Sequence, residues 1–160
     1  MIYLICPVFG RVEKTVAAIE SIKEKLDGDF KIVLLDDHPS YSTLEAFNDD
    51  ESLEVIRGNG SLYWGGGINR LIDYVEQQYQ PDNNDIIVFF NNDIVVESTV
   101  DDDFWALVNK YGLVHPALVN EKGLSIPAGS KIKRWIPFLT VKDTSLHSYD
   151  GCVSVDMASA

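Results

Sequence analysis

Short apolar runs alternate with amphipathic segments along most of this 160-residue chain. The apolar runs cover residues 2–6, 31–35, 53–56 and 85–90, and the segments predicted as helices between them cover 12–26, 42–47 and 66–78. This alternation predicts β–α–β units, whose right-handed crossovers place helices on the faces of a parallel sheet. We therefore predict an α/β fold, a three-layer sandwich with a mainly parallel sheet.

The pattern after residue 93 is less regular. We expect a short strand at 94–97, a helix at 99–110, a strand at 113–119 and a final strand at 152–157. The acid run 101–103 falls in the first turn of the expected helix, where the helix dipole favours negative charge. We assign these acids to capping rather than to metal binding. Residues 120–151 show no clear period.

Charge and cysteine content narrow the class of partner. The chain has 25 acidic residues against 13 Lys and Arg, a net charge of −12, and this surface repels nucleic acid phosphates. A divalent cation can still join acidic side chains to a small diphosphate ligand. The longest apolar run is too short to span a bilayer. Cys6 and Cys152 lack metal-ligand spacing, which favours reduced thiols in the cytoplasm.

An apolar strand runs directly into Asn91, Asn92 and Asp93 and then resumes as apolar sequence. Three polar groups at the end of a buried strand cost desolvation free energy unless something binds them. The carboxyl ends of strands are also where open α/β sheets bind ligands. Two interpretations remain open for this segment, a polar turn or a metal-bridged phosphate site with Asp93 as the ligand.

Two further segments carry polar or glycine-rich sequence after predicted strands. Asp36 and Asp37 could accept hydrogen bonds from a ribose or a base, or equally from neighbouring backbone amides in a turn. The glycine-rich stretch 58–70 could cradle an anion at a helix N-terminus, or could only allow tight packing. Tyr63 and Trp64 within it are expected to anchor the core rather than to stack on a base.

The remaining polar residues predict no catalytic or metal site. His38, His115 and His147 have no metal-ligand spacing and are expected to be structural or at the surface. Ser, His and Asp form no nucleophile elbow. A small basic cluster beside Trp135 is expected to be a solvated loop rather than a phosphate contact, and it consists of Lys131, Lys133 and Arg134.

Four segments in order resemble the N-terminal half of a family 2 inverting glycosyltransferase with the GT-A fold. Residues 6–10 are similar to the family's Pro-Val-Tyr-Asn ending of the first strand, and residues 34–40 to its Val-Asp-Asp-Gly-Ser segment. Residues 58–69 resemble the Asn-x-Gly-x-x-x-Gly-Gly-x-x-Asn stretch of its rhamnosyltransferase-like members. Residues 90–97 resemble the segment that contains the family's Asp-x-Asp motif.

The resemblance implies roles for individual residues. It places Asn92 near the ribose or the donor sugar, and Asp93 on Mn²⁺ or Mg²⁺ against the diphosphate. The implied chemistry is direct displacement at the anomeric carbon, with a general base on the acceptor hydroxyl and a metal at the departing diphosphate. The residues implied to bind the nucleotide are Pro7, Val8, Phe9, Asp37, Gly65 and Asn69.

Two departures from the family pattern matter. Asn91 stands where the first acid of the motif is usual, so the implied metal site rests on Asp93 alone. The family's catalytic base lies in an acidic segment that we expect beyond Ala160, which leaves the catalytic residues unknown. We therefore expect residues 1–160 to form a single nucleotide-sugar-binding domain, truncated before the acceptor-binding half.

The resemblance predicts a hexosyltransferase-type enzyme of surface polysaccharide synthesis that acts on a saccharide or lipid-linked acceptor. We expect it in the cytoplasm, or peripheral at the inner face of the membrane. One alternative is a nucleotide-sugar-binding module or truncated fragment without transfer activity. A second, a sugar-phosphate nucleotidylyltransferase, would need a long loop rich in Gly, Arg and Lys after the first strand, which residues 7–11 do not match.

Overall fold

The computed structural model describes residues 1–47, 50–114, 116, 118–120, 122, 125–126, 129–132, 140–142 and 157–158. The chain divides into two compact units, Met1–Asp102 and Asp103–Ala160, and each is described by itself. Unit 1 contains the main sheet and the sequence segments of greatest interest.

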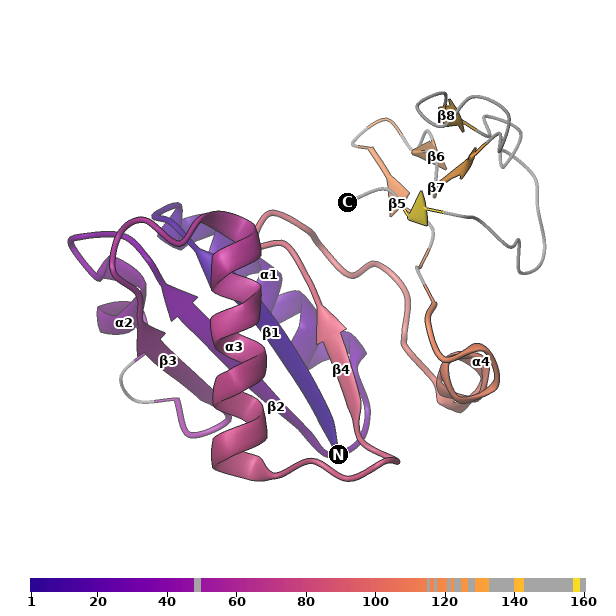
Figure 1. The fold of residues 1–160 in the computed structure, drawn as a ribbon, viewed down its shortest axis with the longest axis horizontal. Coiled ribbons are helices and arrows are strands. Elements are labelled where there is room, and N and C mark those ends of the chain that lie inside the picture. Colours follow the sequence, from indigo (N-terminus) through magenta and orange to yellow (C-terminus); the bar gives the residue numbers. More distant parts are fainter. Residues whose placement is uncertain are drawn as a thin grey trace. The chain divides into compact units, whose positions relative to one another are not determined.

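Unit 1 is built on a parallel sheet of four strands (Figure 1). The strands are β1 (Ile2–Val8), β2 (Phe30–Asp36), β3 (Leu53–Arg57) and β4 (Ile86–Phe89). Their order across the sheet is β3-β2-β1-β4, and every pair is parallel. Leu4 of β1 lies opposite Ile32 of β2 on one side and Val88 of β4 on the other. The predicted α/β fold with a parallel sheet is confirmed.

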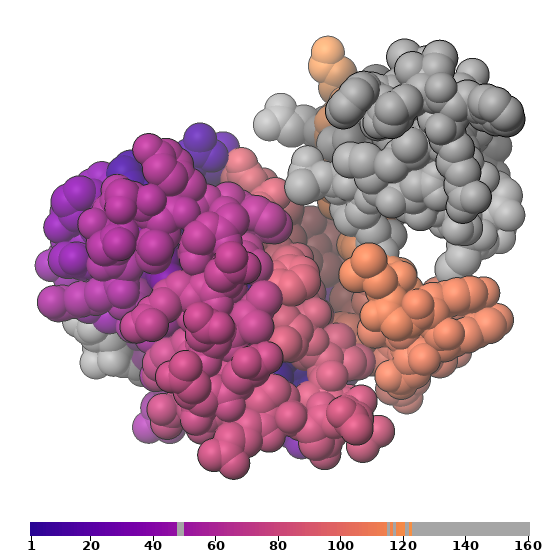
Figure 2. Space-filling view, in the orientation of Figure 1, coloured from indigo at the N-terminus to yellow at the C-terminus, as the bar shows by residue number. Residues whose placement is uncertain are grey.

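Three helices connect these strands, α1 (Val12–Lys25), α2 (Ser42–Ala46) and α3 (Tyr63–Tyr79). The chain steps from β1 to β2 to β3 in one direction and then returns to place β4 beyond β1. Because crossovers are right-handed, this reversal puts α3 on the face opposite to α1. Figure 1 shows α3 in front of the sheet and α1 behind it, and Figure 2 shows α3 in magenta on the near face.

The core follows the two-residue period of the strands. Alternate strand residues meet the apolar stripe of α3 in one buried cluster, which consists of Tyr3, Ile5, Val33, Leu35, Ile68, Leu71 and Val75. The intervening strand residues Leu4, Ile32 and Leu34 are buried on the other face, as are Ala18, Ile19 and Ile22 of α1. Each fully buried Leu or Ile contributes roughly 1.5–3 kcal/mol to folding.

Several elements extend beyond their predicted bounds, and β1 and α3 are the clearest cases. β1 continues through Pro7 and Val8, which pair with β2. Proline is tolerated there because odd-numbered residues of β1 turn their backbone groups toward β4, as the bond from the Phe90 amide to the Ile5 carbonyl shows. The β1–β4 pairing ends at Ile5, so the missing N–H of Pro7 breaks no ladder bond. α3 begins at Tyr63, three residues before the predicted start.

The predicted strand at 94–97 is wrong, because this segment pairs with no strand in the part of the chain that the structure describes. Ile94 and Val96 are half-buried and Val95 is exposed, which reproduces the burial period of a strand. The Val96 amide instead donates to the hydroxyl of Ser21 on α1 at 3.1 Å. A segment held against a helix can therefore have the alternating burial of a strand without the hydrogen bonds of a sheet.

Unit 2 follows the sequence prediction less closely. α4 (Asp102–Tyr111) begins three residues after the predicted start, with Asp102 and Asp103 in its first turn. In the predicted strand 113–119, only β5 (Leu118–Val119) is a strand among the described residues. β5 pairs antiparallel with β6 (Ser125–Ile126), and β7 (Gly129–Ile132) pairs antiparallel with β8 (Thr140–Lys142) and β9 (Met157–Ala158).

Sequence patterns did not predict the strands within 120–151. Of the predicted final strand at 152–157, only Met157 lies within the described residues. Across the part of the chain that the structure describes, no helix has the length and apolarity needed to cross a membrane.

Candidate functional site

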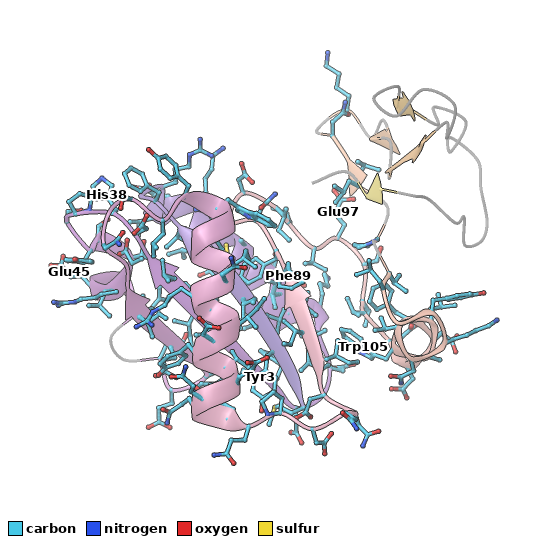
Figure 3. The ribbon with its side chains drawn as sticks, in the orientation of Figure 1. Tyr3, His38, Glu45, Phe89, Glu97 and Trp105 are labelled. Carbon is cyan, nitrogen blue, oxygen red and sulfur yellow. The ribbon has the colours of Figure 1, made fainter. Side chains whose placement is uncertain are left out.

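The carboxyl edge of the sheet gathers most of the polar segments that the sequence singled out. The strand order reverses between β1 and β4, and open α/β sheets bind ligands at such a switch point. The loops at this edge follow Val8, Asp36, Arg57 and Phe89. Figure 3 shows His38, from the loop after β2, at the end of the sheet opposite to Tyr3.

Asp36 is fully buried and holds the start of α2. Its carboxylate accepts hydrogen bonds from the amides of His38 at 3.0 Å, Thr43 at 2.9 Å and Leu44 at 3.2 Å. The residue that precedes α2, Tyr41, provides no side-chain cap, so Asp36 supplies the acceptor that a helix N-terminus needs. Of the two interpretations of Asp36, the structure supports the turn carboxylate.

Asp37 is buried and holds the glycine-rich loop. One carboxylate oxygen accepts from the amides of Asn59 at 2.9 Å and Gly60 at 2.7 Å, and the other accepts from Leu62 at 2.8 Å. A side chain at Gly58 would place its Cβ 2.2 Å from Oδ1 of Asp37. Glycine is therefore required at position 58, and the acid fixes the approach of the loop to α3.

The first turn of α3 is exposed at this edge. Tyr63 is 84% exposed and Trp64 is 49% exposed, so the prediction that they anchor the core is wrong. Gly65 is exposed, and a Cβ built on it would meet nothing within 4 Å. Asn69, one turn further along α3, is also exposed. These groups therefore lie where a ligand can reach them.

Two contacts fix α3 against its neighbours at the same edge. A Cβ on Gly67 would lie 2.5 Å from Cβ of Pro7, so glycine lets the helix approach β1 closely. The indole nitrogen of Trp64 donates to the side-chain oxygen of Asn91 at 3.2 Å. The second contact brings the N-terminal turn of α3 to the polar residues that follow β4.

The residues after β4 are tied to α1 through Thr15, which is fully buried. The Thr15 hydroxyl donates to the carbonyl of Arg11 at 3.2 Å and accepts from the side-chain amide of Asn92 at 3.0 Å. Beside this link, the Arg11 guanidinium lies 3.3 Å from a carboxylate oxygen of Asp93. The switch point thus carries one carboxylate and one guanidinium, from the loops after β4 and β1.

Aromatic groups border the edge near β2 and β3. The rings of Phe9 and His38 meet edge to face with their centroids 4.9 Å apart, and Phe9 is exposed. The His38 ring nitrogen Nδ1 lies 2.7 Å from the Ser40 hydroxyl. The Arg57 guanidinium lies over the ring of Tyr41, 4.7 Å from its centroid.

Strained backbone concentrates at the same edge. Four non-glycine residues have positive φ in the part of the chain that the structure describes. Gln80 is one of them and ends α3, a usual place for this conformation. Arg11 and Tyr41 lie in the loops after β1 and β2 with φ of 59° and 49°, and Tyr63 is the first residue of α3 with φ of 54°. Such strain costs roughly 1–3 kcal/mol per residue and clusters at functional sites.

Cys6 lies beneath this edge in β1 and stays protonated. Burial and, to a lesser extent, the negative charge of Asp93 raise the pKa of its thiol to about 12, although a hydrogen bond from the Asn92 backbone partly opposes both. The thiol is therefore inert at neutral pH. Cys6 does not act as a nucleophile or as a metal ligand in this arrangement.

The metal prediction can be tested against the side chains present. Among the residues that the structure describes, no group of three or more His, Cys, Asp or Glu could hold a metal ion. Asp93 is a single carboxylate, 40% exposed. Mg²⁺ and similar ions keep several waters and often bind through one carboxylate plus the phosphates of a substrate. Asp93 fits a cation of that kind and does not fit a cation held by protein alone.

Several residues that the sequence analysis considered lie outside the described residues. They are His115, Lys133, Arg134, Trp135, His147 and Cys152.

Two residues of the site, Thr15 and Arg11, were not predicted from the sequence. Thr15 could have been noticed as a hydroxyl on the apolar face of α1, between Val12 and Ala18. Nothing local in sequence joins Arg11 to Asp93.

A parallel α/β sheet, with an acid-anchored glycine loop and polar residues at its switch point, defines a protein with a GT-A-type nucleotide-sugar transferase fold. Residues 3–134 match the family described as glycosyl transferase family 2, so the chain belongs to this family. No curated protein matches the chain. The predicted family is confirmed, and glycosyltransferase activity is the general function that it supports.

Proposed function

We propose that this chain is the donor-binding portion of a glycosyltransferase that uses a nucleotide-diphosphate sugar and inverts the anomeric carbon. One observation carries the proposal: the bond from Trp64 joins the N-terminal turn of α3 to Asn91, two residues before Asp93. Helix N-termini attract anions through their free amides and the helix dipole. A diphosphate at this place would meet the exposed backbone of Gly65 and the one carboxylate available for a cation.

The nucleotide would lie along the edge toward β2, against the residues assigned to it. Asp37 already accepts three amide bonds, and a carboxylate has about four acceptor positions, so one position suits a donor on a base. The side-chain NH2 of Asn92 has two hydrogens and gives one to Thr15, so a contact with ribose or sugar would use the second hydrogen or the amide oxygen. The full nucleotide set is Pro7, Val8, Phe9, Asp37, Gly65 and Asn69.

Asp93 would hold Mn²⁺ or Mg²⁺, which supplies charge stabilisation for the departing diphosphate. The finer parts of the proposal come from the sequence resemblance: a rhamnosyltransferase-like, hexosyl-transferring enzyme with a saccharide or lipid-linked acceptor. On the same resemblance we propose that the enzyme acts in surface polysaccharide synthesis, in the cytoplasm or at the inner face of the membrane. We also propose that residues 1–160 form a single domain.

Calorimetry with uridine, guanosine, cytidine and deoxythymidine diphosphates tests the donor site, with and without Mn²⁺. We expect one of them to bind more tightly with Mn²⁺, and we expect Asp93→Ala to remove that gain. Failure of all four to bind, or metal-dependent binding that survives Asp93→Ala, would refute the site. The alternative of a binding module without transfer activity predicts the same binding but no release of nucleoside diphosphate from a sugar donor in the presence of acceptors.

A further inference from the structure

Arg11 is placed at the switch point by its backbone and by a buried side chain. Its main chain is left-handed, with φ of 59° and ψ of 44°, at the residue that precedes α1. Its carbonyl accepts bonds from both the amide and the hydroxyl of buried Thr15, at 3.0 and 3.2 Å. Thr15 is in turn bonded to Asn92, the neighbour of Asp93. The same buried hydroxyl therefore positions both partners of the Arg11–Asp93 pair.

The pair itself is loosely made. A single guanidinium nitrogen, Nη1, reaches one oxygen of Asp93 at 3.3 Å, whereas charge-assisted bonds of this kind usually measure about 2.7–2.9 Å. The two side chains are 63% and 40% exposed. Exposed ion pairs contribute little to stability and exchange readily with solvent and ligands. The strained backbone of Arg11 is therefore not explained by a strong bond between its side chain and Asp93.

A diphosphate that approaches Asp93 meets a carboxylate of the same sign. A guanidinium has five N–H donors in a plane and binds phosphate through two parallel bonds, which a single long contact to Asp93 leaves unused. A cation at Asp93 would be repelled by the guanidinium beside it. The repulsion between Asp93 and the diphosphate and the repulsion between Arg11 and the cation are both removed if the cation binds Asp93 while Arg11 binds the phosphate.

We propose that Arg11 is a diphosphate-binding residue that neutralises Asp93 in the free protein and moves to the donor phosphates when a cation binds Asp93. This inference rests on the proposed function. It predicts opposite effects of Arg11→Gln on two affinities. The variant binds Mn²⁺ alone more tightly, because a competing charge is gone, and it binds nucleoside diphosphate with Mn²⁺ more weakly.

The test measures free Mn²⁺ by its electron paramagnetic resonance signal, and nucleoside diphosphate binding by calorimetry, in the wild type and three variants. Arg11→Gln should raise the affinity for Mn²⁺ alone about threefold and lower the diphosphate affinity at least about tenfold. Arg11→Lys keeps the charge without the planar donors, so its affinities should lie between those of the wild type and those of Arg11→Gln. Lys25→Gln is the matched control, since it removes one charge of α1 roughly 21 Å along the helix.

The outcomes separate the inference from the proposed function. If the wild type binds a nucleoside diphosphate and Arg11→Gln binds it equally well, the role of Arg11 is refuted and the donor site stands. If Lys25→Gln weakens binding as much as Arg11→Gln, the effect is one of net charge, and the role is again refuted. If the wild type binds no nucleoside diphosphate, both proposals fail. Thermal unfolding of each variant checks that its fold is intact.

Discussion

The side-chain amide of Asn92 donates a hydrogen bond of 3.0 Å to the hydroxyl of Thr15, which lies 77 residues earlier in the chain. Thr15 is fully buried in α1 and also bonds the carbonyl of Arg11. One hydroxyl thus joins the loop after β1 to the residues after β4, across the point where the strand order reverses. The geometry of the candidate site depends on this joint.

Thr15→Val should lower the free energy of unfolding by about 1–3 kcal/mol, because it leaves the Asn92 amide without its acceptor. Thr43→Val is the matched control. Thr43 is equally buried, and its hydroxyl has no hydrogen-bond partner within the described structure, so valine should be neutral or stabilising there. Urea denaturation measures both. Equal losses in the two variants would contradict the role given to Thr15.

Two glycines of the same loop region should respond oppositely to alanine. Gly58→Ala forces a Cβ to within 2.2 Å of the Asp37 carboxylate and should cost about 1–3 kcal/mol of stability. Gly65→Ala meets open space in the first turn of α3, and it should preserve or raise stability by up to about 1 kcal/mol. Denaturation curves for the two variants check the prediction. A Gly58→Ala protein as stable as the wild type would contradict it.

The donor-site proposal adds a second expectation for the Gly65→Ala variant. Its Cβ would stand where the diphosphate is expected to approach the backbone, so nucleoside diphosphate binding should weaken although the fold is unharmed. Unchanged calorimetric affinity in that variant would remove Gly65 from the proposed binding residues.

Glu54 of β3 accepts hydrogen bonds from the phenols of Tyr74 and Tyr79 on α3. The bond to Glu54 raises the pKa of Tyr74 to about 12, and burial followed by the same bond raises the pKa of Tyr79. Because the folded state holds these protons more tightly, their contribution is complete below the unfolded pKa of about 10 and is lost as pH rises toward 12.

The measurement for this cluster is the unfolding temperature from pH 8 to pH 12. The wild type should be more stable than Glu54→Gln at pH 8, and the difference should shrink above pH 10. A difference that stays constant over the whole range would show that ionisation of Tyr74 and Tyr79 is not linked to Glu54.

The Cys6 thiol should resist alkylation in the folded protein. Its pKa of about 12 keeps the thiolate scarce at pH 8.5, and the side chain is buried in β1. Iodoacetamide treatment followed by peptide mass analysis should leave Cys6 unmodified without denaturant and modify it in urea. Equal modification under both conditions would contradict its burial.

The four strands of unit 1 and their connecting helices could be predicted because each buries an apolar stripe of its own period. Val33 and Leu35 on one side of β2, and Leu71 and Val75 on one side of α3, are examples. The prediction of a strand at 94–97 was wrong, since this segment alternates in burial while its Val96 amide bonds Ser21 of α1 instead of a strand. Alternation of apolar residues indicates which side chains are buried, but it does not indicate whether the segment pairs with another strand.

The location of the site at the carboxyl edge of the sheet could be predicted from the sequence, but the contacts between its residues could not. Asp37 and Asp93 follow predicted strands, so their placement at one edge follows from parallel topology. The use of Asp37 by three amides of the glycine loop depends on the path of that loop. The pairing of Arg11 with Asp93 spans 82 residues and depends on tertiary packing. Tyr63 and Trp64 were expected in the core because aromatic residues are usually buried.

The central claim is that the carboxyl edge of the sheet binds the donor, and amide chemical-shift mapping tests it most directly. Titration of the isotope-labelled chain with nucleoside diphosphate and Mg²⁺ should shift the amide signals of Gly65, Asn69, Asn92 and Asp93. The signals of Asn84 and Asp85, in the turn before β4 at the opposite edge, should stay in place. Shifts confined to that turn, or no shifts at saturating ligand, would contradict the account.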